Sequence, residues 1–299
     1  VIYEASSSLA SGASGNDVGL YNPRFTAEHD KIGQFYSSAF QNALGVFEIF
    51  NDDIDWNPCG ALHLMTDEKK ERRFNKMVAN WPWSSDDMRL VDAQEASDIS
   101  GVDVLSDCLY LHKSGKISPK KMCAAYANGV EVVLNTPVPD VSMLGGDVVV
   151  LACGMGVLNF KEGAHLPLKA VRGQVSYIGQ IKVSEKLRCT LGFGGYIAPA
   201  EGGVHCLGST FQRWLDHSDI IPEDDISNIS KLCDAVPSLA GDYEVVGHRA
   251  AVRTTSNDHF PVFGQLAEGL YVSTAHGSHG ILSSLQAAIF LADQISKQT

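Results

Sequence analysis

The segment Asp147 to Ala152 constrains the fold of this chain more than any other part of its sequence. It reads Asp-Val-Val-Val-Leu-Ala and places four large apolar residues in a row. An unbroken run of this kind is typical of a parallel strand covered on both faces, because a strand with one wet face alternates polar and apolar residues. We therefore expect a parallel sheet with cover on both sides, and Val1 to Tyr3 supplies another short apolar strand.

Helices and strands alternate through the first half of the chain, as in a mixed α and β protein. Between Ala27 and Phe50 the apolar residues recur at helical spacing, which predicts one long amphipathic helix. Pro82 ends a charged helix, since proline blocks helix continuation. The remaining elements are expected at residues 60–65 (strand), 67–79 (helix), 118–128 (helix, with Pro119 in its first turn) and 130–134 (strand).

The second half of the chain favours antiparallel strands. Residues 170–178, 196–199 and 204–209 alternate or run apolar between glycines, which is typical of antiparallel pairing. A strand at 269–275, a glycine turn and a helix at 281–295 follow. The apolar residues of this helix fall on one face: Ile281, Leu285, Ala288, Ile289, Ala292 and Ile295. The patterns together predict an α/β unit combined with an α+β unit.

Charge and cysteine content exclude several classes of protein. The formal net charge of −12 repels phosphate on average, which counts against autonomous RNA binding. No apolar run approaches the roughly 18 residues that a membrane helix needs. The seven cysteines are scattered without Cys-x-x-Cys spacing, which argues against a disulfide framework or a structural zinc site and favours a reduced, cytoplasmic setting.

Glu4 ends the first strand, at the place where a dinucleotide-binding unit puts the acid that bonds the adenosine ribose. In such units the acid follows a G-x-G-x-x-G loop by about 20 residues. This sequence contains no such motif. We therefore expect the phosphate-binding loop to precede residue 1. The plain alternative is an ordinary acid at a strand end.

Three glycine-containing segments have the composition of a cofactor cradle. The first offers exposed amides and hydroxyls to a phosphate or a flavin edge, and consists of Ala10, Ser11, Gly12, Ala13, Ser14, Gly15 and Asn16. Gly154 turns the chain after the strand at 147–152, where ligands of such folds bind. Residues 277–280 open the final helix, whose positive dipole end favours an anion. A linker, a tight turn and a plain helix start remain the alternatives.

Arg253 lies between apolar strand residues and a polar turn, which suits a fork-shaped donor for a carboxylate. A structural salt bridge is the alternative. Oxidation of an amine by a flavin needs no protein nucleophile, only a substrate carbon held against the cofactor and a neutral amine. No Ser-His-Asp arrangement and no metal-ligand cluster with recognised spacing competes with this interpretation of the sequence.

In this order, the segments resemble the FAD-dependent oxidoreductase domain of the bifunctional tRNA 5-methylaminomethyl-2-thiouridine biosynthesis proteins, a branch of the D-amino acid oxidase-like flavoproteins. The resemblance spans nearly all 299 residues. It rests on residues 9–16, 166–176, 252–264 and 277–281 taken together.

The resemblance implies a Rossmann-like FAD-binding domain, without its first βα unit, at residues 1–34, 115–163 and 247–299. It implies a substrate domain with a mixed or antiparallel sheet at 35–114 and 164–246. Glu4 would hold the ribose, residues 10–16 and Gly154 would line the flavin, and the pyrimidine edge would be met by Gly277, Ser278, His279, Gly280 and Ile281. Arg253 would hold the substrate carboxylate, with Tyr196 in the same pocket.

The implied reaction oxidises a secondary amine to an imine, whose hydrolysis removes the carboxymethyl group of 5-carboxymethylaminomethyl-2-thiouridine in tRNA as glyoxylate. His279 stands where the family has arginine, and Ser256-Asn257 replace a Thr-Arg pair. An oxidase of free glycine-like or D-amino acids and a cofactor-free inactive chain therefore stay open. We expect tRNA or a small amine as substrate, a methyltransferase as fused domain or partner, weak or absent FAD binding, and a homodimer formed through an exposed sheet edge.

Overall fold

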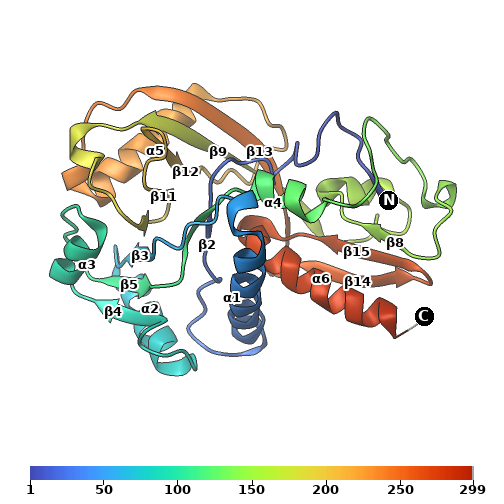
Figure 1. The fold of residues 1–299 in the computed structure, drawn as a ribbon, viewed down its shortest axis with the longest axis horizontal. Coiled ribbons are helices and arrows are strands. Elements are labelled where there is room, and N and C mark those ends of the chain that lie inside the picture. Colours follow the sequence, from blue (N-terminus) through green and yellow to red (C-terminus); the bar gives the residue numbers. More distant parts are fainter. Residues whose placement is uncertain (298–299) are drawn as a thin grey trace.

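One eight-stranded sheet dominates the fold (Figure 1), which a computed structural model describes for residues 1–297. The strand order is β13-β9-β12-β11-β10-β3-β5-β4, and every neighbouring pair is antiparallel except β10 and β3. The strands are β3 (Ala61–Leu64), β4 (Met88–Val91), β5 (Cys108–Leu111), β9 (Leu168–Gly179), β10 (Thr190–Gly192), β11 (Tyr196–Ile197), β12 (Val204–Gly208) and β13 (Val245–Ser256). The mixed, mainly antiparallel sheet of the prediction is confirmed.

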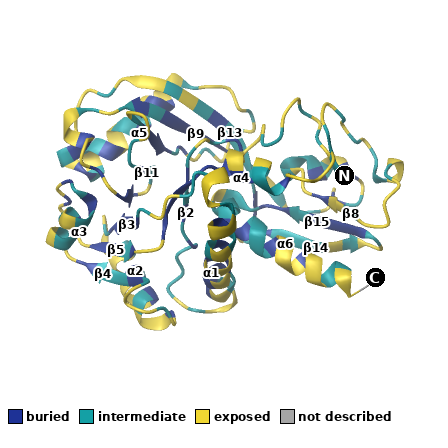
Figure 2. Cartoon of the chain, viewed as in Figure 1, coloured by how far each residue is buried: buried dark blue, intermediate teal, exposed yellow. Residues whose placement is uncertain are grey.

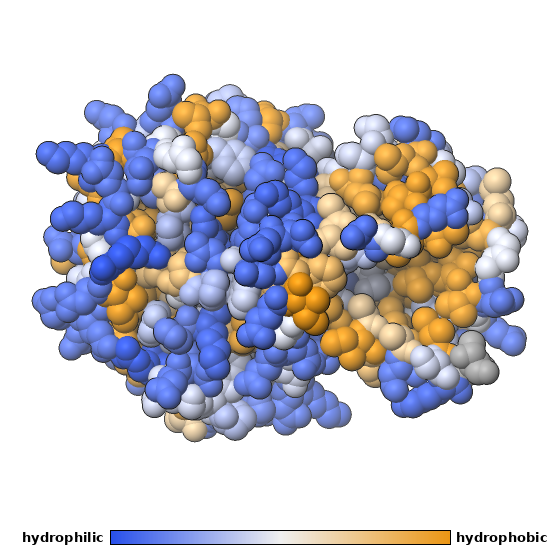
Figure 3. Space-filling model, in the orientation of Figure 1, coloured by the Kyte–Doolittle hydropathy of each residue, from blue (hydrophilic) through white to orange (hydrophobic). Residues whose placement is uncertain are grey.

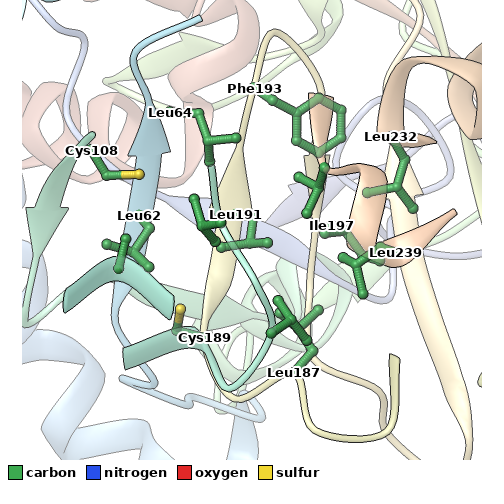
Figure 4. Packing of buried hydrophobic residues seen from close by; sticks show 14 of the residues in the cluster. Leu62, Leu64, Cys108, Leu187, Cys189, Leu191, Phe193, Ile197, Leu232 and Leu239 are labelled. Carbon is green, nitrogen blue, oxygen red and sulfur yellow. The ribbon is translucent and has the colours of Figure 1, made fainter. Parts of the chain in front are cut away.

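Helices cover both faces of this sheet. On one face Leu62, Leu191 and Ile197 are fully buried in a cluster with α3 (Ala93–Ser100) and α5 (Pro222–Ala235), and Figure 4 shows how their side chains meet. On the other face Phe74 and Met77 of α2 (Glu68–Asn80) pack against β3 and β5. The large sheet therefore has its own apolar core on each side at the β3–β5 end.

Three smaller sheets and two long helices make up the rest. β1 (Ile2–Tyr3) pairs in parallel with β7 (Val132–Val133), and β2 (Gly19–Tyr21) pairs antiparallel with β6 (Gly115–Ile117). β8 (Val149–Leu151) runs parallel to β15 (Leu270–Thr274), which pairs antiparallel with β14 (Val262–Ala267). The helices are α1 (Lys31–Phe50), α4 (Pro119–Tyr126) and α6 (Gly280–Ser296), and the short 3-10 turns are η1 (Asn51–Asp53), η2 (Val141–Met143), η3 (Gly154–Asn159), η4 (Lys182–Ser184), η5 (Pro237–Leu239) and η6 (Gly277–His279).

Local capping explains where the predicted helices begin and end. Asp30 accepts hydrogen bonds from the amides of Ile32 and Gly33, both at 3.0 Å, and so starts α1. Asp67 does the same for α2 through the amide of Lys70 at 2.8 Å. The predicted helices at 27–50, 67–79 and 118–128 are confirmed, and each begins one to four residues later than the sequence indicated.

Two details of the prediction are wrong. The strand at 147–152 forms and pairs in parallel, but only one of its faces is covered. Val149 and Leu151 pack in an apolar cluster, whereas Val148 and Val150 on the other face are 37% and 42% exposed. In α6 the buried positions include Leu282 and Leu291, whereas Ile289 is 44% exposed, so the helix turns a different stripe inward. Figure 2 shows the exposed outer side of α6.

A buried polar network fastens α5 to β9. The Arg172 guanidinium is fully buried and donates to Asp224 and, at 2.8 Å, to the side-chain oxygen of Gln174. Asp225 accepts from Ser176 at 2.6 Å and from Gln174 at 3.0 Å. Because every charge here has hydrogen-bonded partners, the network holds the first turn of α5 against the sheet.

None of the helices in residues 1–297 is both long and apolar enough to cross a membrane. All seven cysteines are unpaired thiols, and three of them are buried: Cys108, Cys189 and Cys206.

Candidate functional site

One face of the large sheet turns toward the glycine-rich loop near the start of the chain. Side chains alternate along a strand, so Arg249 and Arg253 of β13 share a face while Val252 and its partner Arg172 point the other way. Arg172 belongs to the network beneath α5. The two remaining arginines therefore project from β13 toward the opposite side of the sheet.

Arg253 is the group in this region with the least complete set of partners. Its Nη2 donates to the Ser209 hydroxyl at 2.7 Å, whereas the buried Nη1 has no partner among the described residues. Gly173 makes room for it, since a Cβ there would lie 1.9 Å from Nη1. Burial lowers the pKa of Arg253, but a guanidinium stays charged at neutral pH. A buried cation with free donors fits a carboxylate.

Tyr196 lies near Arg253, because it pairs with Gly208 and the next residue, Ser209, accepts the hydrogen bond from Arg253. Its hydroxyl is 3.6 Å from the Cys206 sulfur. Burial raises the pKa of Tyr196 far above its ordinary value, so the phenol stays neutral and keeps a proton to donate. The structure thus brings together the two residues that the sequence suggested for the substrate pocket.

Arg249 holds the loop at residues 10–16 in place. Its guanidinium donates to the Asn16 side chain and to the Ser11 carbonyl, both at 3.0 Å, and also to the Gly12 carbonyl. Gly15 is buried beneath these bonds, and a Cβ there would lie 2.3 Å from both the Ala10 carbonyl oxygen and Arg249 Nη2. The segment Ser11 to Ser14 stays exposed, where a ligand can reach it.

The carboxyl ends of β1 and β8 meet beside this loop. The Glu4 carboxylate accepts from the Ser6 amide at 2.8 Å, and it lies near enough to Cys153 to contribute to a raised thiol pKa, of which burial is the main cause. Gly154 follows with φ of +59°, and its carbonyl accepts from the Thr274 hydroxyl at 3.1 Å. A left-handed residue at this point favours glycine.

The start of α6 follows β15 and lies near the same strand ends. Gly277 has φ of +58°, and no side chain caps the helix, so the positive end of its dipole is not covered by a capping side chain. Burial lowers the pKa of His279 to about 4, and its ring nitrogen donates to the Asn22 carbonyl at 3.4 Å. At neutral pH this histidine is uncharged, unlike an arginine. Ser278, which lies between Gly277 and His279 in the chain, is exposed.

This arrangement fits a flat, anionic cofactor such as FAD. A Cβ added at Gly12 would meet nothing within 4 Å, so the loop leaves open room beside its amides. The loop, Gly154 and the α6 start contain no acidic residue, which suits phosphate or a reduced flavin. Glu4 is the acid in the set, as ribose hydroxyls require.

Several residues of this site escaped the sequence analysis. Arg249 contacts a loop 233 residues away in the chain, and nothing in its local pattern signals that contact. Thr254 lies beside Gly154: a Cβ added to Gly154 would be 3.1 Å from the Thr254 hydroxyl. Thr255 lies beside Gly277. Only the alternation along β13, which places residues 249 and 253 on one face, could have pointed to Arg249.

The family model described as "FAD dependent oxidoreductase" matches residues 1–294. Among curated relatives, the tRNA 5-methylaminomethyl-2-thiouridine biosynthesis bifunctional protein MnmC of Idiomarina loihiensis is 31% identical and aligns with 97% of this chain. Its counterpart in Chromobacterium violaceum is 30% identical over 95% of this chain. This chain covers 51% of each of these relatives, so it spans about half their length.

Solved structures with different titles share the fold. Glycine oxidase from Geobacillus kaustophilus superposes with a TM-score of 0.84 at 20% identity, covering 99% of this chain and 87% of that chain. L-proline dehydrogenase from P. horikoshii has a TM-score of 0.78 at 13% identity, covering 93% and 83%. At these identities the likeness concerns the fold.

Proposed function

Because this chain belongs to the FAD-dependent oxidoreductase family, we propose that it oxidises the N–CH₂ bond of a secondary amine that carries a carboxylate on that carbon. The observation that carries this proposal is the buried Arg253 guanidinium with its unpartnered Nη1. A carboxylate that accepts from Nη1 pairs the charge, and it fixes the adjacent CH₂ carbon at a constant distance from the sheet.

The proposed reaction balances as a two-electron oxidation followed by hydrolysis. When bound, FAD would supply the two-electron acceptor for the hydride that leaves the CH₂ carbon. The amine nitrogen loses its proton to solvent and a C=N bond forms. Water then adds to that carbon and the C–N bond breaks, which yields a primary amine and glyoxylate.

The residues of this chain bind and orient rather than exchange covalent bonds. Arg253 holds the carboxylate, and the neutral Tyr196 hydroxyl donates to it or to the amine side of the substrate. FAD would be held by Glu4, residues 10–16, Gly154 and the α6 start. The cofactor-binding part comprises residues 1–34, 115–163 and 247–299, and the substrate part comprises 35–114 and 164–246.

For the natural substrate we favour the carboxymethylaminomethyl group of a tRNA uridine. The names of the relatives from Idiomarina loihiensis and Chromobacterium violaceum support it, since both are tRNA 5-methylaminomethyl-2-thiouridine biosynthesis proteins. The primary amine left by the reaction is what a methyltransferase, as another domain or a partner, would use. Free glycine-like amino acids are the second candidate, which the fold of glycine oxidase favours.

The test is a titration of the purified chain with FAD, followed by visible absorbance and by trapping of glyoxylate. We expect the purified chain to show the absorbance bands of bound flavin only after excess FAD is added. With FAD bound, we expect it to release glyoxylate from a carboxymethylaminomethyl-uridine in RNA. Arg253→Met should leave the flavin bands unchanged and abolish glyoxylate release. Flavin bands without glyoxylate from either the RNA or glycine would contradict the proposed reaction.

A further inference from the structure

The loop between β12 and α5 carries the most exposed large aromatic side chain of the molecule next to an arginine. Trp214 is 77% exposed, and of the four tryptophans within residues 1–297 it is the exposed one. Just before it in the chain, Arg213 stacks on Phe211, with the guanidinium carbon 5.5 Å from the ring centre. A single exposed apolar residue is ordinary, but here two exposed aromatic residues and an arginine lie within four positions of the chain, and such a cluster suits a binding surface.

Backbone pairing fixes the direction of these side chains. Gln212 exchanges two backbone hydrogen bonds with Arg172, at 2.9 and 3.0 Å, and its side chain reaches Asp224 under α5. By alternation Phe211 and Arg213 point to the opposite face, the face of Arg253. The loop therefore faces the candidate site because its middle residue is held from behind.

Phe211 connects the buried site to the surface. Its ring centre is 5.9 Å from the Arg253 guanidinium carbon on the inside, and the residue is 42% exposed. Arg213 stacks on the same ring, and Trp214 follows in a turn, where strand alternation no longer sets the direction of the side chain. A substrate that anchors its carboxylate on Arg253 and extends to solvent passes this wall of alternating rings and guanidinium groups.

We propose that Phe211, Arg213 and Trp214 form a stacking platform for the unpaired nucleotides that flank the reacting base of an RNA. The proposal rests on the proposed function, because it takes the RNA as carrier of the amine. Sequence-tolerant binding of single-stranded RNA combines aromatic faces and arginine planes, on which bases stack, with cationic contacts to the backbone. Arg213 supplies the local cation that a chain of net charge −12 needs in order to meet RNA.

Intrinsic fluorescence isolates Trp214, because Trp81 is 3% exposed and Trp56 and Trp83 are half-buried. The probe is an unmodified anticodon stem–loop RNA with uridine at the wobble position. The difference in emission between wild type and Trp214→Phe is the Trp214 signal. We expect the RNA to quench that difference and to leave the emission of Trp214→Phe nearly unchanged.

Affinity measurements provide the second arm. Trp214→Ala should weaken RNA binding roughly 5- to 150-fold, as expected for the loss of one stacked base. Arg213→Ala should lower the slope of log affinity against log salt by about 0.7, the value for one contact to single-stranded RNA. The matched controls are Arg72→Ala on α2, where Arg72 is 72% exposed, and Phe290→Ala on α6, where Phe290 is 45% exposed.

Equal losses in the control variants, or binding of Trp214→Ala at wild-type strength, would overturn the platform. So would a Trp214→Ala variant that changes self-association and not RNA binding, which would make the loop a protein contact. The outcome is separate from that of the oxidation: RNA binding is measured without FAD, and loss of stacking leaves glyoxylate release from a free N-carboxymethyl amine intact.

Discussion

At the scale of single residues, the molecule contains charges and polar atoms that its own fold does not use. Arg253 Nη1 and His63 Nε2 are buried, and neither has a hydrogen-bond partner among residues 1–297. An unpartnered buried polar group lowers the stability of the folded state. Natural chains keep such groups where a ligand completes them, so these two residues offer sharp tests.

Arg253→Met should increase the free energy of unfolding by about 1–3 kcal/mol while it removes carboxylate binding, because an unpaired buried charge is replaced by an apolar side chain of similar length. Arg249→Met is the matched control on the same sheet face. It should decrease stability, since it breaks the bonds to Ser11 and Asn16. Urea unfolding of both variants measures this, and equal destabilisation would mean that Arg253 is a structural residue.

His63 predicts a pH dependence of stability. Burial lowers its pKa to about 3, whereas the unfolded chain takes up the proton near pH 6.5. The unfolded state therefore binds more protons between these values, and stability is complete above about pH 6.5 and falls as the pH falls toward 3. When the pH is lowered from 7.5 to 5, we expect the free energy of unfolding of His63→Gln to fall by about 2 kcal/mol less than that of wild type.

The control for this experiment is His165→Gln, because His165 is exposed. Urea unfolding at the two pH values should show the same fall in free energy of unfolding for this variant as for wild type. If His63→Gln also showed the wild-type fall, His63 would be protonated in the folded state.

The residue scale also shows where sequence reasoning stops. Glu4, residues 10–16 and Arg253 were suggested by composition, by position and by family resemblance. Arg249 was missed because its partner loop lies 233 residues away and only the folded sheet brings the two together. From sequence alone, a single arginine in a strand is predicted to lie at the surface. Its contacts become clear only when its neighbours across the sheet are known.

At the scale of elements, local signals predicted helices well and burial poorly. The Asp30 and Asp67 caps act within three residues, so the sequence contains everything that starts α1 and α2. The elements α1 and β15 pack against α6 and decide which of its faces is buried. The sequence of α6 alone therefore does not predict that face. For the same reason β8 formed as predicted but lacks the cover that its composition indicated.

The attachment of α5 gives a prediction at this scale. Asp224→Ala leaves Arg172 buried without its carboxylate and should cost about 3–5 kcal/mol of folding free energy. Glu223→Ala removes an acid of the same helix turn that is exposed, and should change stability by less than about 1 kcal/mol. Denaturant unfolding compares the two, and similar values would place the attachment of α5 in its apolar contacts instead.

At the scale of the whole molecule, the two ends differ in surface character. Figure 3 shows apolar side chains gathered over the part of the molecule that holds β8, β14, β15 and α6, whereas the large-sheet part is mostly hydrophilic. Val148, Val150, Ile289 and Phe290 are among the exposed residues there. In the part of the chain that is described, β1 and β8 each have one unpaired edge, which invites pairing with another chain.

We therefore expect purified protein to self-associate, and Val150→Lys to shift it toward monomer because a charge on an edge strand opposes pairing. Val183→Lys is the matched control, since Val183 is 44% exposed and lies on η4 next to the large sheet. Light scattering after size-exclusion chromatography measures the mass. A monomeric wild type, or the same shift in both variants, would contradict association through the β8 edge.

The position of Arg249 and Arg253 on a single strand has a geometric consequence. Four residues of extended chain separate them by roughly 13 Å, and the long ladder between β13 and β9 keeps that spacing stiff. The irregularity near Val245 lies before both arginines, so a slip there would carry them along together. β13 thus fixes the distance between Arg249, which holds the loop at residues 10–16, and Arg253, which would hold the substrate carboxylate. Insertions elsewhere in the chain can change the walls of the pocket without changing that distance.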